Sequence, residues 1–265
     1  MTTTALARSR AYLAEQRRAI IGRALAASLA GALPVPFLDD WAIGTILGRG
    51  YRRIAAAHQV DLDDAAVRSL VFGNQAPTSL TELAASGIAL RIAGRAARRM
   101  MVVLATFNRA RSAARTFTAM TLFDHYCARL HTGLALDGPT ALALRGEIAK
   151  AIEGTPGALA VHPFRRGALA AARATLRAPL ELADLASGGA LRKLLARRSG
   201  VTEAEAVDDL DAAVENALAS KTGFLGRAAA AVEIQLSAEV NPFLDGAIES
   251  LDRRWRARVA AGQPK

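Results

Sequence analysis

One short stretch near the middle of the chain holds the densest group of side chains that could do chemistry. Asp124, Cys127 and His131 stand at positions i, i+3 and i+7, so they share one face if the stretch is helical. A carboxylate, a thiolate and an imidazole could bind one metal ion, with His58 or His162 as a fourth ligand. In the structural alternative, Cys127 is a small core residue and Asp124 pairs with a nearby Arg. His131 would then lie near a helix C-terminus, where its cation is favoured.

A long basic stretch is the second candidate. No acidic residue occurs from Leu83 to Phe123, and the Arg residues there are Arg91, Arg95, Arg98, Arg99, Arg109, Arg111 and Arg115. The first three recur at helical spacing and predict a basic stripe on an amphipathic helix. Such a stripe can bind anionic lipid or nucleic-acid phosphates. The absence of interleaved aromatics and of a helix-turn-helix signature favours lipid over nucleic acid. Alternatively, the stripe pairs with acids of the second half, namely Asp208, Asp209, Asp211 and Glu215.

An apolar segment from Ala24 to Gly48 is the third candidate. It is interrupted by Pro34 and Pro36 and by the acidic pair Asp39 and Asp40. The prolines end a helix, and two carboxylates are costly in hydrocarbon, so we expect no membrane span here. The segment is either a buried core hairpin or an interfacial hairpin that inserts its turn into a membrane. The residues of this apolar turn are Pro34, Pro36, Phe37, Leu38 and Asp39.

Familiar catalytic motifs are absent from the sequence. It has no P-loop, no Gly-x-Ser-x-Gly elbow, no His-Glu-x-x-His and no Glu-x-x-His pair. The single cysteine, Cys127, excludes an intramolecular disulfide and fits a reducing compartment. Met1 to Arg18 lacks the apolar run of a secretory signal. We therefore expect a cytoplasmic protein that acts without catalysis and without a cofactor.

Composition indicates the fold class that must position these side chains. The 265 residues are 52% hydrophobic but only 5% aromatic, and Ala, Leu and Arg dominate. Strong helix formers with few β-branched and aromatic residues predict an all-α protein, a multi-helix bundle of about ten helices. The net charge of +10 resides mainly in the first half of the chain.

Capping residues and breakers predict where the helices begin and end. We expect helices over about 5–32 and 38–57, and a short one capped by Asp61 that ends near Gly73. Ser79 to Glu82 forms a capping box for a helix that reaches Arg99 or Phe107. The later helices expected are one over 109–131, one from Pro139 to about Gly154, and about four more ending near Val259.

Two helical halves are indicated by a shift of charge and by a repeated motif. The stretch from Glu153 to Pro163 interrupts the helical pattern, which predicts a basic half over 1–155 and a second half over 156–265 packed on it. Ile21-Gly22-Arg23-Ala24 followed by Pro36-Phe37-Leu38-Asp39-Asp40 recurs as Leu225-Gly226-Arg227-Ala228 followed by Pro242-Phe243-Leu244-Asp245-Gly246. Either the halves are similar, or the match is a coincidence of Ala-rich helical sequence.

Motifs in the first half resemble a known family. They are the turn Pro34-Val35-Pro36-Phe37-x-Asp39, the helix with Tyr51-Arg52-Arg53-Ile54-Ala55 running into Val60-Asp61, and the helix from Arg115-Thr116-Phe117 to Tyr126. Together they resemble the helical domain of EcsC-like proteins and the YcjF-type domain attached to some bacterial GTPases, over about residues 20–131. The resemblance implies a bacterial helical module at or near a membrane, and it implies no catalytic residues.

These observations favour a membrane-surface or partner-binding module. The seven Arg residues would contact an anionic membrane surface, such as the inner face of the plasma membrane, or a protein partner. The alternative is a soluble helical carrier that holds an apolar small molecule in its Ala-lined interior. A third hypothesis is an enzyme whose activity depends on Asp124, Cys127 and His131 and on a metal bound by them.

Overall fold

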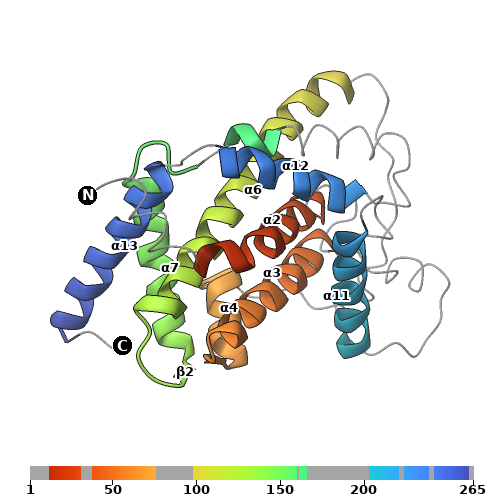
Figure 1. Cartoon of the computed structure of the whole chain (residues 1–265). Helices are drawn as coiled ribbons and strands as arrows, with labels where there is room; N and C mark the ends of the chain where they lie inside the picture. The colour runs from red at the N-terminus through yellow and green to blue at the C-terminus, as the bar shows by residue number, and fades with distance from the viewer. Residues whose placement is uncertain are drawn as a thin grey trace.

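A computed structural model describes residues 12–30, 38–75, 98–159, 161–165, 203–220, 224–238 and 242–262. Over these residues the chain is all-α apart from one pair of two-residue strands (Figure 1). The elements are α2 (Tyr12–Ala30), α3 (Leu38–Ala57), β1 (Asp61–Leu62), α4 (Asp64–Phe72), α6 (Arg98–Arg129), β2 (Ala135–Leu136), α7 (Gly138–Glu153), α11 (Glu203–Ala219), α12 (Phe224–Ala238) and α13 (Pro242–Ala260). The predicted helical bundle is therefore confirmed. The capping box at Ser79 and the helices expected between 166 and 200 lie outside the described residues.

The long helix α6 runs through the middle of the bundle. It packs against α2, α3, α7 and α13. Its core-facing side chains include Met120 and Phe123, and the ring of Phe123 meets Tyr51 of α3 edge to face, with 5.0 Å between the centroids. The sequence analysis expected one helix that reaches Arg99 or Phe107 and another over 109–131, and a break between Arg99 and Arg109 is wrong because α6 is continuous there. Neither Gly nor Pro occurs between Arg98 and Arg129, so nothing ends the helix there.

Helices α2 and α3 form a close pair whose contact is made by small residues. Ala24, Ala30 and Ala42 are fully buried, because alanine side chains allow helix backbones to approach closely. At the end of α3, Gln59 adopts φ 60°. The amide of Val60 donates to the carbonyl of Ala55, which caps the helix as in a Schellman motif.

A unit of strand, capping aspartate and helix occurs twice in the structure. β1 and β2 are parallel, with Leu62 beside Leu136, and each strand is followed directly by an aspartate that caps the next helix. Asp63 accepts from the amide of Ala66 at the start of α4, and Asp137 accepts from the amide of Thr140 in α7. The N-cap of α4 is thus Asp63 and not the predicted Asp61, because Asp61 belongs to β1.

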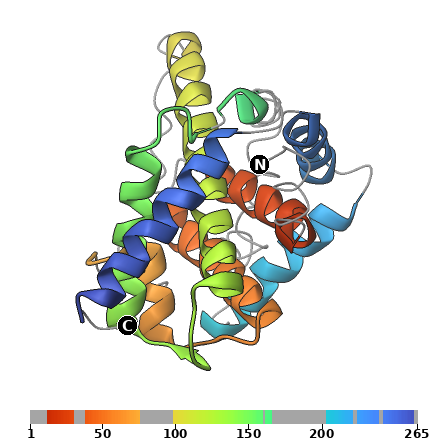
Figure 2. The ribbon, with the colours of Figure 1, turned by 60° about the vertical axis from the view of Figure 1, so that its left-hand side comes forward.

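The described helices of the second half pack on the first. α12 lies along α2, α11 contacts α3, and α13 lies along α7, where Figure 2 shows it crossing the front of the molecule. The repeated motif found in the sequence has different surroundings in its two copies. Arg23 is buried, whereas its counterpart Arg227 is exposed.

Candidate functional site

The basic stretch is described only in part. Arg91 and Arg95 lie outside the described residues. Arg98 and Arg99 begin α6, and their backbone alone is described. The remaining three side chains, Arg109, Arg111 and Arg115, lie on α6.

Along this part of α6 one face is buried and the other is exposed. The buried side chains are Ala110, Ala113, Ala114 and Phe117, and the exposed ones are Asn108, Arg111, Ser112 and Arg115. Burial lowers the pKa of the half-buried Arg109 below its usual range. The guanidinium of Arg115 is 3.3 Å from Glu153, whereas Arg111 has no ion-pair partner within the described part of the chain.

Three of the acids named for the second half, Asp208, Asp211 and Glu215, pair with arginines outside the basic stretch. The pairs are Arg49 with Asp208, Arg23 with Asp211 (2.8 Å), and Arg23 and Arg53 with Glu215 (both 2.6 Å). Arg23 is only 2% exposed, so α11 is anchored by a buried guanidinium on α2. Asp208, Asp211 and Glu215 therefore do not neutralise the described part of the basic stretch.

The N-terminal end of α6, which is drawn in yellow, extends beyond the other described helices in both Figure 1 and Figure 2. Its sequence from Met100 to Phe107 contains no charged residue and lies between Arg98-Arg99 and Arg109. The first turn of α6 contains no acid. None of the described helices combines the length and apolar character needed to cross a bilayer.

The apolar turn cannot be placed. Pro34, Pro36 and Phe37 lie outside the described residues, and Leu38 and Asp39 begin α3 with only their backbone described. On either side of the turn, Leu25 to Ala30 and Trp41 to Ala42 are buried in the core between α2 and α3. Most of the described part of the segment thus packs in the core, whereas Asp40 is exposed.

The three candidate metal ligands do not converge. Oδ1 of the fully buried Asp124 is 2.5 Å from Nε2 of His58 on α3, whereas His131 faces the hydroxyl of Tyr126 at 3.2 Å. Within the described residues, no group of three His, Cys, Asp or Glu side chains could hold a metal ion. The partner of Asp124 is therefore His58, and the predicted arginine is wrong.

Burial raises the pKa values of two side chains in this cluster, Asp124 and Cys127. It raises the pKa of Asp124, against the opposing effects of the hydrogen bond and charge of His58. Burial, and then the nearby Asp124, raise the pKa of the Cys127 thiol far above its usual range. Cys127 thus stays a neutral core side chain, as the structural alternative predicted.

A hydrogen-bonded relay joins three helices nearby. The hydroxyl of Tyr12 (α2) is 2.5 Å from Nδ1 of His125 (α6), whose Nε2 is 2.6 Å from Asp252 of α13. The guanidinium of Arg129 lies 5.1 Å from the centre of the Tyr12 ring. The relay ties the first and last described helices to α6, and sequence spacing could not predict it because its members are far apart in the chain.

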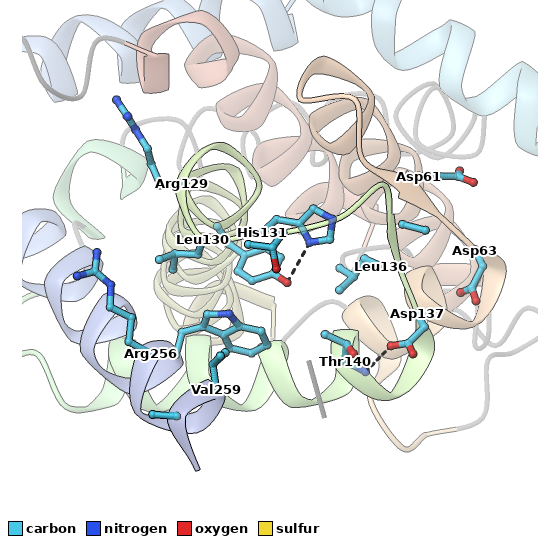
Figure 3. A pocket seen from close by; sticks show the side chains of 15 residues that line it. Asp61, Asp63, Arg129, Leu130, His131, Leu136, Asp137, Thr140, Arg256 and Val259 are labelled. Atoms are coloured by element: carbon cyan, nitrogen blue, oxygen red, sulfur yellow. Dashed lines mark hydrogen bonds between the residues drawn. The ribbon is translucent and has the colours of Figure 1, made fainter. Parts of the chain in front are cut away.

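A pocket of about 570 Å³ opens at the C-terminal end of α6 (Figure 3). Its apolar wall contains Tyr126 from α6, Leu136 from β2 and Trp255 from α13. The rings of Tyr126 and Trp255 meet edge to face, with 5.0 Å between their centroids. Ligand pockets in proteins have about this volume and a similar apolar lining.

Charged side chains of opposite sign lie on opposite sides of this pocket. Figure 3 shows Asp61, Asp63 and Asp137 on one side and Arg129 and Arg256 on the other. Hydrogen bonds from the Thr140 hydroxyl and amide lower the pKa of Asp137, so this carboxylate is ionised at neutral pH.

His131 lies between the two charged sides. Burial lowers its pKa, against a hydrogen bond to the backbone of Gly133 that raises it. The cation predicted for His131 is therefore disfavoured. Its Nε2 is buried and has no hydrogen-bond partner in the described structure. A neutral imidazole next to an apolar wall can accept or donate one hydrogen bond.

The sequence analysis missed this pocket. Its lining comes from β1, α6, β2, α7 and α13, and sequence order does not bring these segments together. One signal was available: a leucine followed by an aspartate and a helix occurs at Leu62-Asp63 and again at Leu136-Asp137.

Comparisons of the chain with protein families, curated proteins and solved structures find no match. The resemblance to EcsC-like and YcjF-type domains stays a prediction.

Proposed function

We propose that this protein is a peripheral module that docks on an anionic membrane surface through the N-terminal end of α6. The observation that carries the proposal is the extension of this helix end beyond the other described helices. Amphipathic helices that combine apolar residues with Arg bind anionic bilayer surfaces without spanning them.

The charges of this end support docking on an anionic surface. Arg98 and Arg99 add to the positive end of the helix dipole, and no acid occurs in the first turn. Arg111 is exposed and carries no ion pair among the described residues. The segment from Met100 to Phe107 is uncharged in sequence, and its apolar residues would insert between headgroups.

Sedimentation with vesicles tests the proposal. The protein should co-sediment with vesicles containing phosphatidylglycerol at low salt, and binding should fall at high salt. It should not bind vesicles of phosphatidylcholine alone. Because each basic residue near the surface contributes about 1 kcal/mol, Arg98→Gln with Arg111→Gln should lower the partition coefficient by about 30-fold.

A matched variant separates local docking from net charge. Arg18→Gln with Arg253→Gln removes the same charge from exposed positions on α2 and α13. This variant should bind anionic vesicles nearly as the unchanged protein does. Equal losses in the two variants, or no binding to anionic vesicles at all, would refute docking through α6.

A soluble carrier of an apolar molecule is the alternative that the sequence left open. Its Ala-lined interior would have to contain space for the ligand, and the alanines at the described α2–α3 contact are packed. A ligand extracted from the purified protein, together with no vesicle binding, would favour the carrier.

A further inference from the structure

We propose that the pocket at the C-terminal end of α6 binds a small zwitterion with a flat apolar body. The cationic group would lie at the aspartate side, and the anionic group would lie at the arginine side. The proposal is independent of docking on a membrane, because it concerns the opposite end of α6.

The apolar wall provides the place for the body of the ligand. Trp255 and Tyr126, which are 4% and 2% exposed, line the pocket, and Leu136 continues the wall. An aromatic or broad aliphatic group of a ligand packed here would remove its own apolar surface from water.

The aspartate side favours a cationic group. Asp63 and Asp137 are committed to capping α4 and α7. Asp61 begins β1, and Asp63 follows two residues later with extended backbone, so both side chains lie on the same side of the chain. The exposed carboxylate of Asp61 has no partner among the described side chains. An ammonium group near Asp61 would gain the attraction of all three carboxylates.

The arginine side favours an anionic group. Arg129 is exposed, and its only contact given by the structure is with the Tyr12 ring. Arg256 is 74% exposed, and its guanidinium is 3.8 Å from Asp252. Neither guanidinium is bound closely by a carboxylate, so both can turn toward a carboxylate or phosphate of a ligand.

Three probes with the same ring separate the two charges of the ligand. 4-(Aminomethyl)benzoate is the zwitterion, because it carries an ammonium group and a carboxylate at opposite ends of a flat ring. Its methyl ester carries only the ammonium group, and its N-acetyl form carries only the carboxylate. The emission of Trp255 reports binding in a Trp41→Phe background, since Trp41 and Trp255 are the two tryptophans. Calorimetry on the unchanged protein checks that this background substitution does not alter binding.

4-(Aminomethyl)benzoate should bind saturably, and the ester and the N-acetyl form should each bind at least about fivefold more weakly. Asp61→Asn should weaken binding of 4-(aminomethyl)benzoate and of the ester, but not of the N-acetyl form. Arg256→Gln should weaken binding of 4-(aminomethyl)benzoate and of the N-acetyl form, but not of the ester. Glu205→Gln on α11 is the matched control, because it removes an exposed charge outside the pocket, and it should change none of the affinities.

Two outcomes would overturn the proposal. Equal binding of all three probes would mean that the pocket recognises the ring alone. An absence of saturation by 4-(aminomethyl)benzoate up to about 10 mM would mean that the pocket does not bind this class. Neither outcome bears on vesicle docking.

Discussion

The carboxylate of Asp124 lies beside His58, where water does not reach it. Asp124 is fully buried, and its second oxygen, Oδ2, has no hydrogen-bond partner among the described residues. The contact with His58 is thus the main compensation for taking this charge out of water.

Removal of His58 should destabilise the protein in a pH-dependent way. His58→Ala should cost about 2 kcal/mol of unfolding free energy at pH 8, because it leaves a buried carboxylate without its partner. The cost should be smaller at acidic pH, where Asp124 is protonated. Urea unfolding at several pH values measures this, with the exposed His162→Ala as control. A cost independent of pH would contradict the account.

Asp124→Asn tests the sign of the pKa shift. Since the pKa of Asp124 is raised above 3.8, the folded protein holds a proton that the unfolded chain has released. The free energy of unfolding therefore falls as the pH rises from 3.8 through the raised pKa. Above the raised pKa, Asp124 no longer contributes to its pH dependence. Asparagine still accepts from Nε2 of His58, so this variant should lose that decline and be at least as stable as the unchanged protein at pH 8. A steeper decline would refute the assigned sign.

At the scale of elements, the contact between α2 and α11 depends on one glycine. A Cβ atom at Gly22 would lie 2.2 Å from Cδ2 of Leu218, so a side chain here must displace α11 or the leucine. The same two helices are joined by the buried guanidinium of Arg23, one residue further along α2.

Gly22→Ala should destabilise the protein by about 1 kcal/mol, because overpacking outweighs the gain in helix propensity. In a Leu218→Ala background the clash is absent, so the same substitution should become neutral or stabilising. Gly146→Ala on α7 meets no atom within 4 Å and should stabilise in both backgrounds. Urea unfolding of the five variants measures the coupling, and equal effects of Gly22→Ala in both backgrounds would contradict it.

Local capping chemistry predicted elements better than it predicted the site. The bounds of α3 and α7 follow from Pro36, Asp137 and Pro139, which act through their neighbours in sequence. α4 begins two residues later than predicted because Asp61 belongs to β1, which pairs with β2. This pairing is long-range in sequence, so local capping signals did not indicate it. The pocket could not be predicted for the same reason, since tertiary packing alone brings Trp255 to Tyr126.

At the scale of the whole molecule, the two proposals assign opposite ends of α6 to different tasks. Hydrogen exchange on anionic vesicles should therefore show added protection near residues 98–115 and none at 126–140 or 255–260. The Arg98→Gln and Arg111→Gln variant should lose this protection. Protection at the pocket end alone would reverse the proposed orientation.

The length of α6 has a consequence for how the two ends affect each other. A continuous helix of 32 residues spans about 48 Å at 1.5 Å per residue. The field of a charged bilayer decays within about 8 Å at physiological ionic strength. The charged sides of the pocket would thus lie many decay lengths from the lipid headgroups, and a zwitterion should bind equally well to docked and free protein.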